Sequence, residues 1–262
     1  MDSKQLKTAR PSRRGFLGGS LARLCAAAAG NSPSGAAPAP RPLKVVCVGA
    51  HPDDPESGCG GTLARYAELG HRVTIIYLTR GEAGIRGRSH EEAAAIRTAE
   101  AEAACKILGA KAVFAGQIDG STELNPARSE SFVKLLGAEE PDVVFTHWPL
   151  DTHPDHQIAS LLALRAWRAE SNAQRRFQLY FMEVDLGGET LNFHPTDYVD
   201  ITATREKKKA ALFAHESQNG RGIYQRHHQV MEEFRGRESG VAAAEGFIHL
   251  ARLSRPLPLP GL

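Results

Sequence analysis

The chain has 262 residues, enough for one domain with a buried core, and its hydrophobic content of 42% and charged content of 24% are ordinary for a globular protein. Residues 1–40 hold six of the 32 basic side chains and one of the 30 acidic ones, so residues 41–262 carry a formal net charge of −3. This slightly acidic body argues against a nucleic-acid-binding protein, and it contains no apolar run of about 18 residues that would span a membrane.

The first forty residues differ in composition from the rest of the chain. Basic side chains come first, and the segment Ser12-Arg13-Arg14-Gly15-Phe16-Leu17 is similar to a twin-arginine export signal. A weakly apolar stretch at 16–29 and a Ser/Pro/Ala segment at 31–40 follow in the order typical of a removed signal. We therefore expect residues 1–40 to be a signal and linker, residues 41–262 to be the mature domain, and the protein to be exported to the periplasm or the exterior. A basic tail without structure and a retained anchor are the alternatives.

Strands and helices alternate along the mature domain. Apolar runs predict strands at 43–49, 72–78, 112–114, 143–146, 177–184 and 247–250, and helical spacing with capping residues predicts helices at 55–69, 89–108, 129–136, 156–169 and 204–215. This alternation is typical of a parallel sheet. The predicted fold class is therefore α/β, a Rossmann-like, doubly wound, mostly parallel sheet in three α/β/α layers. In the usual strand order 3-2-1-4-5, the first and fourth strands are neighbours.

A histidine and two aspartates follow the first strand in Ala50-His51-Pro52-Asp53-Asp54. A tight turn at Pro52 would aim His51 and Asp54 at one point and leave Asp53 facing the open side of a bound metal. By itself, the segment is equally consistent with a simple turn that begins the next helix. The turn carries no dinucleotide fingerprint, and its two carboxylates would repel a pyrophosphate, so nucleotide binding is disfavoured.

The second cluster, His153-Pro154-Asp155-His156, follows the fourth strand. His156 begins a helix and can reach back over the strand ends, while Asp155 is expected to hold His153 in one tautomer and favour its charged form. Because the carboxyl ends of neighbouring parallel strands meet at one edge, the two clusters are expected to converge although they are a hundred residues apart. Imidazole nitrogens and carboxylate oxygens are the ligands of catalytic zinc sites. The sequence therefore predicts metal-assisted hydrolysis.

The two clusters in this order resemble the PIG-L/LmbE-like zinc deacetylase family. Three further segments agree with the resemblance, which covers about residues 43–250: Leu78-Thr79-Arg80-Gly81-Glu82-Ala83-Gly84, Leu108-Gly109, and Lys209 to His215-Glu216-Ser217-Gln218. The chain departs from the usual pattern in one place. The family usually has Glu directly after the second Asp, whereas here Pro55 intervenes and Glu56 follows. Whether Glu56 takes the usual supporting role is left open.

The resemblance implies a zinc-dependent N-deacetylase that acts, in many members, on N-acetylglucosamine-type groups. It implies zinc ligands at His51, Asp54 and His156, with Asp53 as the general base. The same nitrogen and oxygen ligands accept other divalent transition metals, so the sequence does not fix the ion.

The resemblance also implies roles for residues around the metal. His153 would stabilise the oxyanion or protonate the leaving amine, assisted by Asp155, and Arg86 would contact substrate hydroxyls, its alternative being a solvated loop arginine. The partner is then a small-molecule or glycan substrate. Two other functions are left open: a zinc amidase or esterase on a non-sugar acyl group, and a non-catalytic carbohydrate-binding relative. The sequence does not settle whether the protein is a homo-oligomer.

Residues outside the two clusters receive weaker predictions. His147 and Trp148 end the fourth strand near the site, where Trp148 is expected to pack in the core rather than stack on a sugar. Asp151 is expected to be a surface carboxylate, His215 either supports the site or stabilises a helix end, and the pair His227-His228 is expected at the surface. The three cysteines of the mature domain are expected to fill the core.

Overall fold

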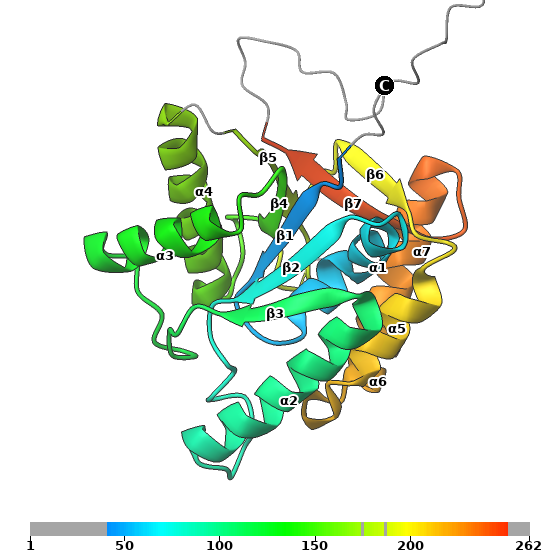
Figure 1. Ribbon diagram of the computed structural model, residues 1–262. Helices are drawn as coiled ribbons and strands as arrows, with labels where there is room; N and C mark the ends of the chain where they lie inside the picture. The colour runs from blue at the N-terminus through cyan, green and yellow to red at the C-terminus, as the bar shows by residue number, and fades with distance from the viewer. Residues whose placement is uncertain (1–40, 174–175, 186–187, 251–262) are drawn as a thin grey trace, which may run out of the picture. The chain divides into compact units, whose positions relative to one another are not determined.

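The computed structural model describes residues 41–173, 176–185 and 188–250; the predicted signal, residues 1–40, lies outside them. At the centre is a seven-stranded sheet (Figure 1) composed of β1 (Lys44–Gly49), β2 (Arg72–Tyr77), β3 (Ala110–Phe114), β4 (Val143–His147), β5 (Gln178–Met182), β6 (Asp197–Asp200) and β7 (Ala244–His249). No helix within the described ranges combines the length and the apolar character that a membrane crossing requires.

The strand order is β3-β2-β1-β4-β5-β7-β6. Strands β1 to β5 pair in parallel with one another, whereas β7 is antiparallel to both β5 and β6. The predicted doubly wound α/β class and its 3-2-1-4-5 order are thus confirmed. The sequence analysis missed β6 because this four-residue edge strand alternates half-buried and exposed positions and has an acidic residue at each end.

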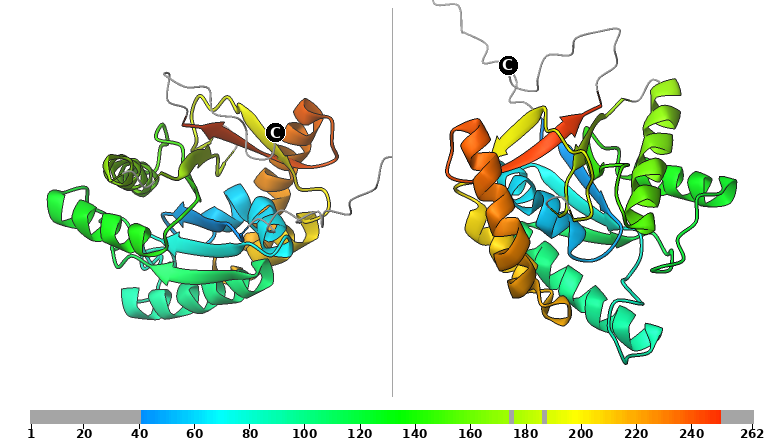
Figure 2. Two further views of the ribbon diagram at one scale, coloured as in Figure 1. Left: turned by 45° about the horizontal axis from the view of Figure 1, so that its top comes forward. Right: turned by 180° about the vertical axis from the view of Figure 1, so that it is seen from behind.

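Helices cover both faces of the sheet (Figure 2). They are α1 (Asp54–Glu68), α2 (His90–Leu108), α3 (Pro126–Ala138), α4 (Pro154–Asn172), α5 (Arg205–Phe213), α6 (Gly220–Ile223) and α7 (Gln229–Ser239), with a short 3₁₀ turn η1 (Glu216–Gln218) and a π-helical turn η2 (Tyr224–His228). Helices α3 and α4 lie on one face, and α1, α2, α5 and α7 lie on the other. Both α3 and α4 begin earlier than predicted because a proline occupies the first helical position, where no N–H is needed.

The core lies on both sides of the sheet because the strands are covered on both faces. On β1, Val45 and Cys47 pack on one side and Val46 and Val48 on the other. Cys47, Cys59 and Cys105 are buried free thiols, in agreement with the expected packing role.

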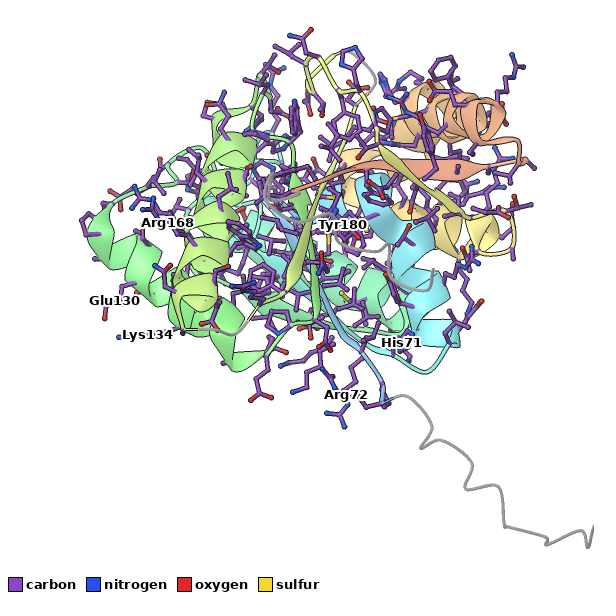
Figure 3. All side chains as sticks on the ribbon, turned by 90° about the horizontal axis from the view of Figure 1, so that it is seen from above. His71, Arg72, Glu130, Lys134, Arg168 and Tyr180 are labelled. Carbon is purple, nitrogen blue, oxygen red and sulfur yellow. The ribbon has the colours of Figure 1, made fainter. Side chains whose placement is uncertain are left out.

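Two pairs of side chains show where aromatic and charged groups lie: the aromatic pair lies between the layers of the fold, and the charged pair lies on the outer face of a helix. In Figure 3, Tyr180 of β5 lies in the interior, where its ring stacks on Phe145 with the ring centroids 5.5 Å apart. Glu130 and Lys134 stand on the outer side of α3, and their side chains form an ion pair at 2.7 Å. The stacked rings therefore lie in the core and the charged pair lies at the surface.

Two glycines let α1 approach the other half of the sheet closely. A Cβ added at Gly61 would lie 2.7 Å from Cβ of Ile201, and one at Gly58 would lie 2.8 Å from the carbonyl oxygen of Glu183. Both contacts are shorter than real side chains tolerate. These glycines therefore serve helix packing and place the start of α1 at the carboxyl end of the sheet.

A buried ion pair attaches α7 to the segment after β5. Arg235 donates from Nε to Glu183 Oε1 at 2.6 Å and from Nη2 to Oε2 at 2.8 Å, and both residues are buried. Two parallel bonds of this kind fix the relative orientation of the two side chains.

Replacing only one member of this pair should be costly, because the other charge stays buried. We expect Arg235→Met to lower the free energy of unfolding by about 3–5 kcal/mol, measured by urea denaturation. The double variant Glu183→Leu/Arg235→Met should lose clearly less. Equal losses in the single and the double variant would contradict this account of the pair.

Candidate metal centre

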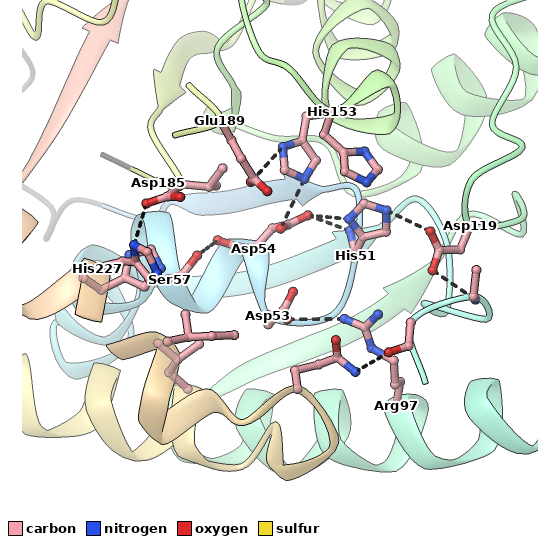
Figure 4. Close-up of a pocket in the computed structure, with 18 of the residues that line it drawn as sticks. His51, Asp53, Asp54, Ser57, Arg97, Asp119, His153, Asp185, Glu189 and His227 are labelled. Atoms are coloured by element: carbon pink, nitrogen blue, oxygen red, sulfur yellow. Dashed lines mark hydrogen bonds and ion pairs between the residues drawn. The ribbon is translucent and has the colours of Figure 1, made fainter. Parts of the chain in front are cut away.

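The two sequence clusters meet at the carboxyl ends of β1 and β4, which are parallel neighbours with Val48 opposite Thr146. A cavity of about 570 Å³ opens there, a volume within the range of ligand sites. Figure 4 shows its lining. Part of the lining comes from the turn after β1, the start of α4 and the loop after β3: His51, Asp53, Asp54, His153, His156, Asp119 and Gly120.

Asp54 lies between two imidazoles. Its Oδ2 is 3.3 Å from His51 Nδ1, and its Oδ1 is 3.4 Å from His156 Nε2. All three residues are buried. With metal–ligand bonds of about 2.0–2.1 Å, neighbouring ligand atoms of a tetrahedral zinc ion lie about 3.3 Å apart. Each contact of Asp54 with an imidazole therefore has the spacing of two ligands on one divalent ion, the role that the resemblance implies for these side chains.

Carboxylates also lie behind both imidazoles. His51 Nε2 is 3.1 Å from Asp155 Oδ2 and 3.2 Å from Asp119 Oδ1. His156 Nδ1 is 3.1 Å from Asp151 Oδ1. Such partners fix the tautomer and orientation of metal-binding histidines. They leave His51 Nδ1 and His156 Nε2 directed at Asp54.

The carboxylates around the centre raise the pKa of two of its histidines, His51 and His156. Burial by itself would lower the pKa of His156, but Asp54 and Asp151 raise it to about 10. Burial is likewise outweighed at His51, whose pKa is raised well above its ordinary value, chiefly by Asp54. The carboxylates thus favour a positive charge at this position, which is what a bound divalent cation would supply.

Other combinations of described residues could also hold a metal. Each includes His51 or His156: His51 with His153 and His156, Asp54 with His147 and His156, His51 with Asp119 and Asp155, and Asp151 with His156 and Glu189. His147 is not free to use Nε2 in this way, because that nitrogen accepts a hydrogen bond from the backbone N–H of Ala50 at 3.0 Å.

Asp155 does not contact His153 through its carboxylate, contrary to the sequence expectation. Besides His51, the carboxylate accepts hydrogen bonds from Gly120 N at 2.8 Å and Thr122 Oγ1 at 2.6 Å. Burial opposes ionisation, but the bonds from His51, Thr122 and Gly120 hold the pKa of Asp155 well below its usual range. Asp155 therefore positions the ring of His51.

His153 caps α4 and lines the cavity. Its Nδ1 accepts the backbone N–H of Asp155 at 3.2 Å, so the proton of the neutral ring is on Nε2. Burial first, and then the neighbouring His51 and His156, lower the pKa of His153. The expected charged form is therefore disfavoured, and His153 is a neutral hydrogen-bond donor.

Asp53 has a strained backbone with φ of 110°, outside the region that non-glycine residues prefer. Its Oδ2 lies 3.3 Å from Nη2 of the buried Arg97. Burial raises the pKa of Asp53 to about 6, with Arg97 acting in the opposite direction. A carboxylate of this kind is ionised at neutral pH and can still accept a proton, as a general base must.

Glu56 supports Asp53 although Pro55 separates it from Asp54. Its Oε2 accepts the backbone N–H of Asp53 at 3.2 Å, and its Oε1 accepts the hydroxyl of Tyr77 at 2.5 Å. His215 Nε2 lies 3.3 Å from the same Oε1, in the interior. Glu56 thus holds the turn that carries Asp53, and His215 supports Glu56 behind the cavity.

Arg86 is exposed on the loop after β2 and does not line the cavity. The arginine that does so is Arg97 of α2, whose Nη2 donates to the backbone oxygen of Pro52 at 2.6 Å. The sequence pattern could have indicated this role, because Arg97 shares the buried face of α2 with the alanines at 93, 94, 101 and 104. The structure therefore places Arg97, and not Arg86, at the cavity and beside Asp53.

Two further residues differ from the sequence expectation. Asp151, expected at the surface, is buried, and its carboxylate accepts hydrogen bonds from His153 N and Thr190 Oγ1. His228, also expected at the surface, is buried and lines the cavity. Asp119 was not singled out at all. Trp148 packs against Phe181 and Phe193, as expected of a core residue.

Comparisons with known proteins agree with this geometry. Residues 46–167 match the PIG-L family, described as GlcNAc-PI de-N-acetylase. A diacetylchitobiose deacetylase of Thermococcus kodakarensis is 30% identical over 218 residues, which cover 78% of this chain and 81% of the relative. The N,N'-diacetylchitobiose deacetylase of Pyrococcus horikoshii superimposes with a TM-score of 0.67 at 27% identity, over 79% of this chain and 84% of that one. A conserved protein of Thermus thermophilus gives 0.68 at 32% identity, over 83% and 96%.

The contact between Asp151 and His156 predicts an effect on metal affinity. We expect Asp151→Asn to weaken zinc binding by about 10–100-fold, because the imidazole loses the carboxylate that orients it. Competition with a chromophoric chelator measures the affinity, and Asp200→Asn, a change at an exposed aspartate of β6, is the matched control. An unchanged zinc affinity in Asp151→Asn would show that this carboxylate does not support the centre.

Proposed function

The chain belongs to the PIG-L family, and from this premise we propose that it removes the acetyl group from an N-acetylated amino sugar or glycan with the help of a zinc ion. The observation that carries the proposal is the buried Asp54 carboxylate between His51 and His156, each backed by a further carboxylate. Relatives named as deacetylases of diacetylchitobiose support the choice of substrate class.

Each residue of the site has its own role in the proposed reaction. His51, Asp54 and His156 would hold the zinc ion, which would supply a water molecule of lowered pKa and polarisation of the acetyl carbonyl. Asp53 takes a proton from the attacking water and returns it to the departing nitrogen, which yields acetate and a free amine. Arg97 keeps the Asp53 carboxylate in place for both transfers.

His153 contributes a fixed hydrogen-bond donor. Because its Nδ1 is occupied by a backbone N–H, the Nε2–H group is available to the acetyl oxygen as negative charge develops there. The ring lies against His156 and His51, with ring centroids 4.7 Å apart in each pair, so it needs little reorganisation when substrate binds.

The proposal predicts metal-dependent acetate release. The full chain, loaded with zinc, should release acetate and primary amine in equal amounts from N-acetylglucosamine or N,N'-diacetylchitobiose. A chelator should abolish this activity, and added zinc should restore it. Hydrolysis confined to non-sugar amides or esters would refute the substrate class, and activity that survives complete metal removal would refute the mechanism.

Asp53 and Asp54 should respond differently to the same change. We expect Asp53→Asn to keep its zinc and lose at least about 100-fold in kcat, because the variant lacks a proton acceptor. In Asp54→Asn the bound zinc itself should fall, since a ligand is weakened. Metal analysis alongside kcat separates the two effects, and near-normal turnover in zinc-loaded Asp53→Asn would contradict the assigned role.

A further inference from the structure

The cavity beside the metal centre is strongly acidic. Arg97 is the one guanidinium or ammonium group among the described residues that line it, and its Nη2 already lies 3.3 Å from Oδ2 of Asp53. With neutral imidazoles, five carboxylates and this arginine give the lining a formal charge of −4, and a zinc ion of charge +2 would leave −2. The carboxylates belong to Asp53, Asp54, Asp119, Asp185 and Glu189.

Glu189 is the carboxylate of this set that has no close cationic partner among the described residues. Its Oε2 lies 4.0 Å from Nδ1 of His156, a nitrogen that Asp151 already contacts at 3.1 Å. The Glu189 side chain is 44% exposed. Figure 4 shows its carboxylate pointing toward the part of the pocket that holds Asp54. The charge of Glu189 therefore acts on whatever enters the cavity.

The backbone around Glu189 is attached to the loop that carries the second sequence cluster. The N–H of Thr152 donates to the backbone oxygen of Glu189 at 2.9 Å, and the N–H of Leu191 donates to the backbone oxygen of Leu150 at 2.8 Å. An isolated antiparallel bridge lies between these two bonds. These contacts keep the charge of Glu189 beside the metal centre.

A fixed negative charge in a partly enclosed site repels anionic ligands. A cleft lined by one sign of charge concentrates ligands of the opposite sign and disfavours those of the same sign. The effective dielectric constant for charges near a protein surface is about 20, well below that of water. A phosphate inside the cavity therefore meets a repulsion worth about tenfold in affinity for a single carboxylate, whereas a neutral sugar meets none.

We propose that Glu189 is a specificity-determining residue, which restricts the substrate to neutral or positively charged N-acetylated amino sugars and rejects those that carry a phosphate or a carboxylate. This inference rests on the proposed function, because the acetamide must lie at the metal centre. It concerns the charge on the rest of the substrate, which the hydrolysis of the acetamide does not fix.

The test compares kcat/KM for acetate release from N-acetylglucosamine and from N-acetylglucosamine 6-phosphate on the zinc-loaded full chain. Wild type should prefer the neutral sugar by more than about tenfold. Glu189→Gln, which removes the charge and keeps the size of the side chain, should lower this preference about tenfold. Glu189→Asp keeps the charge and should keep most of the preference. Glu91→Gln, a change at an exposed glutamate outside the cavity, should leave the preference unaltered.

Salt separates charge repulsion from a steric effect of the phosphate. At about 1 M salt the Debye length is about 3 Å, so the wild-type preference should shrink toward that of Glu189→Gln. Zinc analysis of each variant identifies any change that comes from lost metal. The proposal is overturned if wild type shows no preference, if the preference responds neither to salt nor to Glu189→Gln, or if Glu189→Asp loses it as completely as Glu189→Gln.

Failure of the proposed function looks different, because wild type would then release acetate from neither compound. Calorimetry with glucosamine and glucosamine 6-phosphate decides in that case. The proposal requires that zinc-loaded wild type binds glucosamine more tightly and that Glu189→Gln narrows the difference. Equal binding of the two compounds, or binding of neither, would overturn it.

Discussion

The parallel pairing of β1 with β4 is the constraint on which the site depends. It brings two short segments, a hundred residues apart, to one edge of the sheet and sets Asp54 between His51 and His156. Further carboxylates surround these imidazoles, and burial would make such a charge cluster unstable without a compensating cation. The fold thus creates a position that a divalent ion satisfies.

Contacts elsewhere in the structure keep the side chains of the proposed metal site in place. The glycines of α1 allow the helix to approach the sheet, and the capping interaction of Glu56 secures the strained turn at Asp53. On the far side, the buried pair of Glu183 and Arg235 anchors α7, the helix that continues from η2. The turn that carries the proposed base is therefore supported by a contact outside the set of proposed metal ligands.

The sequence predicted the parallel part of the sheet and the convergence of the two clusters, because apolar runs and the ends of strands are local signals. It did not predict β6, a polar edge strand, or the π-helical turn, which no spacing of residues marks. Asp119 and Asp151 were missed or misplaced because a lone loop carboxylate looks solvated until the fold buries it. Asp155 was assigned to the nearest histidine in sequence, whereas its carboxylate reaches across to His51.

The central claim is that one divalent ion joins the two clusters. A crystal structure of the zinc-loaded protein, with anomalous scattering at the zinc edge, tests it most directly. The account predicts a single strong peak within bonding distance of His51 Nδ1, Asp54 and His156 Nε2. A fully loaded crystal with no peak between these side chains, or with the ion bound elsewhere, would contradict it.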